Sequence, residues 1–156
     1  MIDLNKSTEI KTSLNIGDRI VAGIVDYIII FSFLFYYVYA FGEPVEDGGY
    51  SVNGLPTLVP FLFWGIMTIG FEQWFGATLG NLLVGLKPAS IRESTFTNSN
   101  KLTFGQSFKR HFLDPIDMFF FGLIGIVTIK NTDKNQRLGD IWANTIVVKT
   151  SDFRKL

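Results

Sequence analysis

Residues 20–41, IVAGIVDYIIIFSFLFYYVYAF, decide the fold class of this chain. A helix of this length spans about 30 Å, which matches the hydrocarbon core of a bilayer. Asp26 is its only formally charged residue. The stretch is too long for the hydrophobic part of a signal peptide, and no small-residue cleavage site follows it. We therefore predict a membrane-spanning helix.

Two further apolar stretches follow in the chain. Residues 55–75, LPTLVPFLFWGIMTIGFEQWF, predict a second spanning helix. Residues 112–129 are only marginally long enough to span, and polar or helix-breaking residues interrupt them: Asp114, Pro115, Asp117, Gly122 and Gly125. We expect this third segment to be broken or re-entrant, with a third full span as the alternative.

The composition agrees with a membrane protein. Of the 156 residues, 47% are hydrophobic, 15% are aromatic and only 18% are charged, whereas soluble domains carry about 25% charged residues. The absence of cysteine excludes disulfides and Cys-based metal sites, and His111 is the single histidine. The formal net charge of zero gives no global field for nucleic acid. We expect no cofactor, no metal and no nucleic-acid partner.

Lysine and arginine are unevenly distributed among the connections. Residues 42–54 contain none, whereas the N-terminal tail, residues 76–111 and the part after the third segment are basic. The positive-inside rule then places the N-terminus and residues 76–111 in the cytoplasm. Three full spans would export the basic C-terminal part, so a re-entrant segment agrees better with the charges. We divide the chain into a cytoplasmic tail (1–19), a membrane domain (20–150) and a C-terminal tail (151–156).

The cytoplasmic connections contain signs of regular structure. Thr103 and Gln106 have the spacing of a capping box, which predicts a helix from Phe104 toward Leu113. Residues 84–93 and 145–149 have the character of strands and can pair on the cytoplasmic face. We detect no internal repeat. The predicted fold is an all-α membrane protein with two spanning helices, a broken third segment, a short cytoplasmic helix and a small β-pairing.

Ionisable side chains within the membrane segments are the candidate functional residues, because each costs about 2.5–3.5 kcal/mol at a helix centre. Arg19 and Asp26 lie about two turns apart and share one face of the first helix. With Glu72 and Asp117 they form a candidate ion, proton or structural polar site. All the acids fall in the cytoplasmic half, which suits a polar cavity that holds a cation or a proton.

Each candidate also has a simpler interpretation. Arg19 can be a positive-inside anchor whose head reaches the interface, and Glu72 can be an interfacial carboxylate in contact with water. The basic cluster of Lys109, Arg110 and His111 can be solvated or contact lipid phosphate. Asp140 can cap the next helix, or form a salt bridge with Arg19 or Arg110.

Four segments in order resemble the RDD family of small bacterial and archaeal membrane proteins. They are GDRIVAGIVDYIII (17–30), FEQWFGATLGNLLVGLKP (71–88), LTFGQSFKRHFLDPID (102–117) and QRLGDIWANTIVV (136–148). The resemblance covers about residues 14–150, and it carries the family's arginine and aspartates onto Arg19, Asp26, Arg110, Asp117 and Asp140, with Arg137 in the last segment. Asn81 departs from the pattern, where the family usually has lysine. The resemblance implies a multi-pass inner-membrane protein, and cation/proton antiport is associated with some members.

Two functional hypotheses remain open. The first is a small secondary transporter or ion/proton exchange module, built from several copies of the chain, in which Asp26 carries a proton or a monovalent cation. The second is a membrane adaptor or accessory subunit, with Arg19 and Asp26 as a structural clamp and a basic face for a partner protein or anionic lipid. An enzyme is not expected, because no Walker sequence, dinucleotide glycine run or serine elbow is present.

Overall fold

The computed structural model describes residues 14–91 and 101–153, so parts of both predicted tails (1–13 and 154–156) lie outside the described residues. Two helices in this part of the chain are long and apolar enough to cross a membrane. The first is α1 (Ile16–Phe41), which begins before the predicted residue 20. The second occupies Leu55–Phe75 and consists of four consecutive segments: η1 (Leu55–Thr57), α2 (Leu58–Gly65), the π-helical η2 (Ile66–Gly70) and α3 (Phe71–Phe75).

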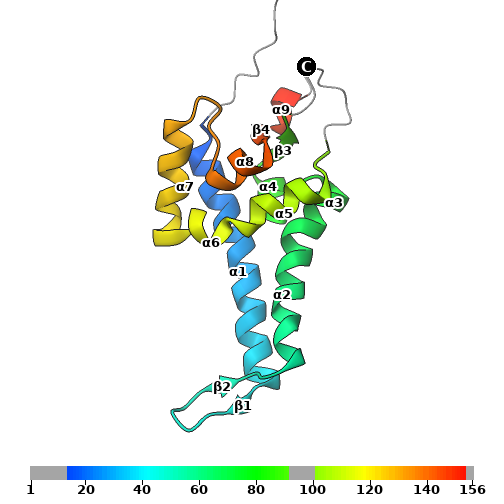
Figure 1. Cartoon of the computed structure of the whole chain (residues 1–156), viewed down its shortest axis with the longest axis vertical. Helices are drawn as coiled ribbons and strands as arrows, with labels where there is room; N and C mark the ends of the chain where they lie inside the picture. The colour runs from blue at the N-terminus through cyan, green and yellow to red at the C-terminus, as the bar shows by residue number, and fades with distance from the viewer. Residues whose placement is uncertain (1–13, 92–100, 154–156) are drawn as a thin grey trace, which may run out of the picture.

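The two long helices form an antiparallel pair, closed at one end by the short strands β1 (Glu43–Pro44) and β2 (Tyr50–Ser51) (Figure 1). Phe33 stacks on Phe63 with ring centroids 3.8 Å apart, and the Tyr37 hydroxyl donates to the Pro56 carbonyl at 3.0 Å. Away from this contact the pair exposes large apolar side chains, including Phe35 and Phe61. Such an exposed apolar surface is the one a lipid bilayer covers.

The third apolar segment is broken, as the sequence predicts. It contains α6 (Asp114–Asp117) and α7 (Phe119–Asn131), which follow the predicted cytoplasmic helix α5 (Phe104–Phe112), and the chain bends by 113° between Phe104–Asp117 and Gly122–Asn131. Gly122 lies at the break with a positive φ of 83°, whereas Pro115 lies in the first turn of α6, where proline is tolerated. With 13 residues, α7 is about 20 Å long and cannot by itself cross the hydrocarbon core.

The predicted capping box and strand pair are both present. The Gln106 N–H donates to the Thr103 hydroxyl, and the Thr103 N–H donates to the Gln106 side chain, so α5 begins at Phe104. The predicted strand 84–93 is observed as β3 (Leu86–Ser90), with residues 92–93 outside the described residues, and it pairs in antiparallel orientation with β4 (Thr145–Lys149). The short helices α4 (Leu79–Leu83) and α8 (Leu138–Ala143) precede them, and α9 (Thr150–Phe153) follows β4.

An internal repeat, which the sequence analysis did not detect, relates α4–β3 to α8–β4. Residues 78–90 align with 137–149 without a gap, and each copy gives a short helix, one residue with positive φ and a strand. The residues with positive φ are Gly85 (69°) and Asn144 (52°). Pro88 pairs with Val147, its own equivalent, so the register of the sheet has twofold symmetry. The repeat is not evident in the sequence because Leu–Gly is the only identical dipeptide in the two copies.

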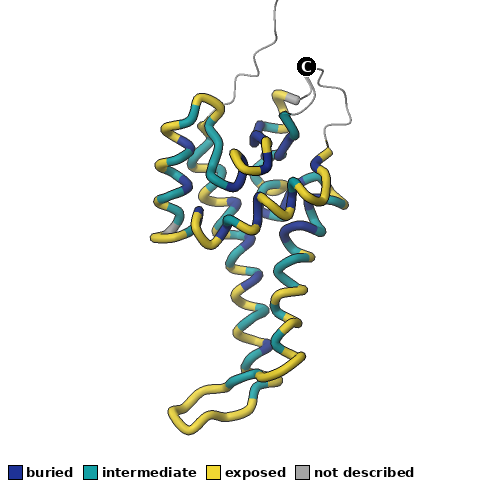
Figure 2. Tube along the Cα trace, viewed as in Figure 1, coloured by how far each residue is buried: buried dark blue, intermediate teal, exposed yellow. Residues whose placement is uncertain are grey.

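Each repeat packs its Leu–Gly glycine against the backbone of a neighbouring helix. A Cβ atom at Gly80 would overlap the carbonyl oxygen of Ala22 in α1, and one at Gly139 would overlap that of Arg110 in α5. Buried residues accordingly gather at this end of the molecule, around α4, α5, α8 and the sheet (Figure 2). The close backbone contacts thus position both repeats on the helices that carry the candidate site residues.

We expect Gly80→Ala and Gly139→Ala to lower the free energy of unfolding by about 1–3 kcal/mol or more, because the methyl group cannot be accommodated without backbone movement. Gly105→Ala is the matched control, since a Cβ there meets no atom within 4 Å. Thermal unfolding in detergent measures the difference. Melting of Gly80→Ala and Gly139→Ala at the temperature of the control would contradict these close contacts.

Candidate functional site

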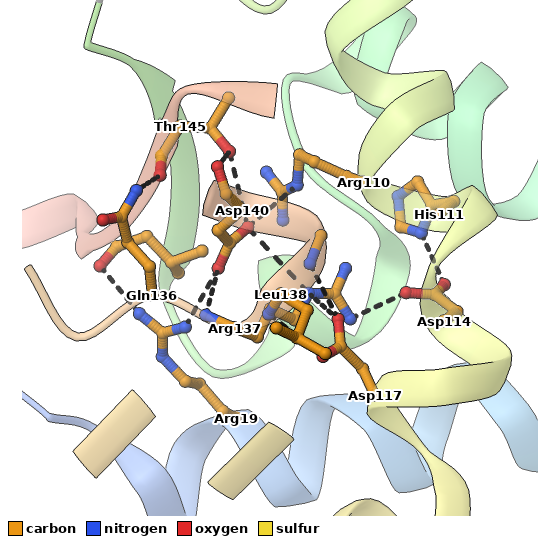
Figure 3. A network of polar contacts seen from close by, with 12 residues as sticks. Arg19, Arg110, His111, Asp114, Asp117, Gln136, Arg137, Leu138, Asp140 and Thr145 are labelled. Atoms are coloured by element: carbon orange, nitrogen blue, oxygen red, sulfur yellow. Dashed lines mark hydrogen bonds and ion pairs between the residues drawn. The ribbon is translucent and has the colours of Figure 1, made fainter. Parts of the chain in front are cut away.

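Eight ionisable side chains of the described residues converge at the end of the molecule that carries the β3–β4 sheet, and Figure 3 labels all of them except Glu72. We call this group the charge cluster. Its side chains are almost entirely buried; Arg110 is 1% and Asp140 0% exposed. Its members come from α1, α3, α5, α6 and α8 with the residue before it: Arg19, Glu72, Arg110, His111, Asp114, Asp117, Arg137 and Asp140.

Asp140 lies at the centre of the cluster. Its Oδ1 is 3.2 Å from Arg110 Nε, and its Oδ2 is 3.4 Å from Arg19 Nη1. Both salt bridges that the sequence analysis considered for Asp140 are therefore formed. The interpretation of Asp140 as a helix N-cap is wrong, because it is the third residue of α8, where its carboxylate accepts the backbone N–H of Arg137 at 3.3 Å.

Glu72 and His111 form a second part of the cluster. Glu72 Oε1 lies 3.1 Å from His111 Nε2 and 3.5 Å from Arg110 Nη1. His111 Nδ1 is 2.7 Å from Asp114 Oδ2, so each ring nitrogen faces a carboxylate. Two carboxylates require two N–H donors, which only the imidazolium form has. The solvated interpretations of Glu72, Arg110 and His111 are wrong, since all three side chains are buried.

Arg137 and Asp117 join the repeat of α8 to the third apolar segment. The guanidinium of Arg137 lies 2.8 Å from Asp114 Oδ1 and 3.8 Å from Asp117 Oδ2. Burial alone lowers the pKa of Arg137. The opposite effect, from the negative charges of Asp114, Asp140 and Asp117, is larger and raises this pKa above its ordinary value. Asp117 also accepts the backbone N–H groups of Leu138 (3.1 Å) and Gly139 (3.0 Å), the first two of α8.

The charges of the cluster balance within the described residues. Three arginines and the imidazolium of His111 face four carboxylates, and each carboxylate has a cation within 4.0 Å. Unpaired charge in a protein interior is strongly unfavourable, so such compensation is what allows these groups to be buried together. No group of three or more acidic or histidine side chains in the described part of the chain is arranged to hold a metal ion.

Asp26 is not one of these charge-paired residues. The structure does not bring it together with Arg19, which instead contacts Asp140 and donates to the Val147 carbonyl at 3.2 Å. Asp26 Oδ1 accepts the backbone N–H of Gly80 at 2.7 Å, and its carboxylate also hydrogen-bonds to the Thr78 side chain. Among the described residues it forms no ion pair within 4.0 Å, although it is only 9% exposed. The proposed clamp between Arg19 and Asp26 is therefore wrong.

A cavity of about 720 Å³ adjoins both Asp26 and the charge cluster. Side chains of α1, of the second spanning helix and of α7 form its walls, and most of them are apolar, among them Ile20, Ile24 and Ile126. Its polar lining includes Asp26, Thr78 and Asn81 together with members of the cluster. This volume falls within the range of about 300–1,000 Å³ that small-molecule sites occupy.

Several parts of this arrangement are not predictable from the local sequence. The pattern around His111 predicts a surface residue, and the contact between Asp26 and Gly80 has no counterpart in the sequence predictions. Two sequence patterns indicate the repeat. The Leu–Gly dipeptide occurs in both copies, and an aspartate seven residues after an arginine occurs in a segment that precedes each copy: Arg19 with Asp26, and Arg110 with Asp117. The cavity itself depends on how α7 folds back beside α1 (Figure 1), which no local pattern encodes.

The fold and the site define a multi-pass helical membrane protein with a buried polar cluster at one end. The model of the RDD family matches residues 15–144, and the chain belongs to the RDD family. The family that the sequence segments suggested is thereby confirmed. Comparisons with curated proteins and with solved structures gave no match.

We expect Asp140→Asn to destabilise the protein strongly, by about 3–5 kcal/mol, because Arg19 and Arg110 would lose a buried carboxylate. Asp18→Asn is the matched control in α1. Asp18 pairs with Lys149 at the surface, where an ion pair contributes at most about 1 kcal/mol. Thermal unfolding in detergent compares the two variants. Equal melting temperatures would show that the Asp140 contacts do not hold the fold together.

Proposed function

We propose that this RDD-family protein is a small secondary transporter or ion/proton exchange module of the inner membrane, in which Asp26 is the carrier. The observation that supports this role is the contrast between Asp26 and the other buried acids. Every carboxylate of the charge cluster has a cation of the chain beside it. In the described part of the chain, Asp26 has backbone and hydroxyl donors only. A buried carboxylate of this kind favours a bound proton or a bound cation.

The exchange step then takes place at a single carboxylate. Protonated Asp26 releases its proton when a monovalent cation enters the cavity, and the carboxylate pairs with that cation. Proton binding reverses the step, so one positive charge always accompanies Asp26. Glu72 and Asp117, which the sequence grouped with Asp26, become positioning residues in this proposal, because both are occupied by contacts within the cluster.

The proposed orientation places the N-terminus and the polar cluster in the cytoplasm and the β1–β2 hairpin outside. Residues 42–54 contain no lysine or arginine, which suits an exported segment. Because α7 is too short to cross, we propose that the bent segment re-enters and returns the C-terminal part to the cytoplasm. Two spanning helices enclose little volume, so we also propose a homo-oligomer as the complete transporter.

A second candidate is a non-transporting adaptor or accessory subunit. The observation in its favour is the charge cluster itself, whose contacts join four separate parts of the chain into one rigid end. In this alternative Asp26 serves only to hold α4 against α1 through the Gly80 N–H. Asparagine at position 26 retains an oxygen that accepts this bond, so the alternative predicts little effect of Asp26→Asn.

We expect Asp26→Asn to abolish cation-driven proton exchange, because asparagine cannot bind and release a proton. The measurement follows a lumenal pH dye in proteoliposomes during pulses of Na⁺, K⁺ or Li⁺. Asp18→Asn is the control, since it removes an exposed carboxylate from the same helix. Exchange of wild-type magnitude in an inserted Asp26→Asn variant would refute the carrier role.

The orientation is tested by cysteine labelling, which is straightforward because the chain contains no cysteine. We expect a membrane-impermeant maleimide to label Asp47→Cys on intact cells and Lys134→Cys only in inside-out vesicles. Asp47 lies in the turn between β1 and β2, and Lys134 lies between α7 and α8. Labelling of Lys134→Cys on intact cells would instead show that the third segment crosses the membrane.

A further inference from the structure

In both repeats, backbone N–H groups at the start of the short helix donate to an aspartate of a preceding helix. In the second repeat, Asp117 accepts the N–H groups of Leu138 and Gly139. In the first, Asp26 accepts the N–H of Gly80, the residue equivalent to Gly139. Asp26 and Asp117 thus occupy corresponding places, each at the first turn of the short helix of its repeat.

The repeats differ in the residue directly before Leu–Gly. In the second repeat this residue is Arg137, whose guanidinium lies 3.8 Å from Asp117 and 2.8 Å from Asp114. In the first repeat it is Thr78, whose hydroxyl accepts the Asn81 side-chain amide at 2.9 Å. The second repeat therefore supplies a cation to its own aspartate, whereas the first repeat supplies a neutral side chain to Asp26.

A second position also has a charged residue in the second repeat and a neutral residue in the first. Asp140, which binds Arg19 and Arg110, corresponds to Asn81 in the first repeat. Asn81 lines the cavity beside Asp26 and Thr78. The first repeat thus keeps one buried carboxylate next to an open volume, where the second repeat has a closed set of ion pairs.

The walls of the cavity restrict which cation suits this carboxylate. Hard metal cations are held by several oxygen ligands. The lining of the cavity includes the neutral side chains of Thr68, Thr78 and Asn81, but most of it is hydrocarbon from α1 and α7, together with the aromatic residues Tyr27, Phe31 and Trp64. Aromatic faces attract organic cations, and apolar walls favour an attached alkyl group.

We propose that the cavity binds an amphipathic organic monocation, an alkylguanidinium or alkylammonium, whose head group pairs with Asp26 as Arg137 pairs with Asp117. The alkyl chain lies along the apolar walls that α1 and α7 provide. The N–H donors of such a head group suit a charge-assisted hydrogen bond to the Asp26 carboxylate. In the other repeat, the guanidinium of Arg137 forms an ion pair with Asp117 at 3.8 Å. This inference rests on the proposed function in taking Asp26 as the carrier, and it names the substrate class.

The test is binding of octylguanidinium to the full chain in phosphatidylcholine nanodiscs. The reporter is the fluorescence of Trp64, which lines the cavity, in a background with Trp74→Phe and Trp142→Phe. We expect saturable binding to the Asp26-containing protein and at least a tenfold weaker affinity with Asp26→Asn, which corresponds to about 1.4 kcal/mol for the charge contact. Octanol and octanoate control for partition of the alkyl chain into lipid.

A converse variant tests the comparison between the repeats. Thr78→Arg places a guanidinium where the second repeat has Arg137, so we expect it to pair with Asp26 and abolish octylguanidinium binding. Asp18→Asn is expected to bind like the parent protein. If Thr78→Arg does not fold, Asp26→Asn decides alone. Equal responses to octanol and octylguanidinium, or an affinity unaffected by Asp26→Asn, would overturn the inference.

The outcomes separate this inference from the proposed function. Asp26-dependent exchange of Na⁺, K⁺ or Li⁺ in proteoliposomes, without binding of octylguanidinium, overturns the organic-cation inference and supports the exchange proposal. Asp26-dependent binding of octylguanidinium, without a pH change when a gradient of that cation or of the alkali ions is applied, supports the site and overturns transport.

Discussion

The pairing of Asp140 with Arg19 and Arg110 is the interaction on which the rest of the structure depends. These side chains belong to α8, α1 and α5, so one fully buried carboxylate holds together elements that are far apart in the chain. In a low-dielectric interior, such charges are tolerated only where each has a partner. The same need for a partner of opposite charge applies to Glu72 and the other members of the charge cluster. Their contacts hold α6 through Asp114 and Asp117, and they hold the β3–β4 sheet through the bond from Arg19 to the Val147 carbonyl.

This constraint gives the two repeats different roles. The second repeat is closed by ion pairs through Arg137 and Asp140, which suits a rigid support. The first repeat has Thr78 and Asn81 at the equivalent positions and leaves Asp26 with hydrogen bonds to neutral groups. Within the described residues, the difference between the two repeats leaves one buried carboxylate, Asp26, beside the cavity without an ion pair.

Much of the fold could be predicted from local patterns. The hydropathy of residues 20–41 and 55–75 sufficed for the two long helices, and the capping box at Thr103 located the start of α5. The partners of the charged residues could not be predicted in this way. Arg19 lies two turns from Asp26 on the same helix, yet it contacts Asp140, because the choice of partner depends on how distant segments pack. Periodicity describes a face of one helix and not what covers it.

Infrared difference spectroscopy of the protein in lipid, recorded between low and high pH, tests the central claim most directly. The carbonyl stretch of a protonated carboxylic acid reports which buried acid carries the exchangeable proton. The account predicts that one of the bands that disappear as the pH rises is missing in Asp26→Asn. Persistence of every such band in Asp26→Asn would contradict the account.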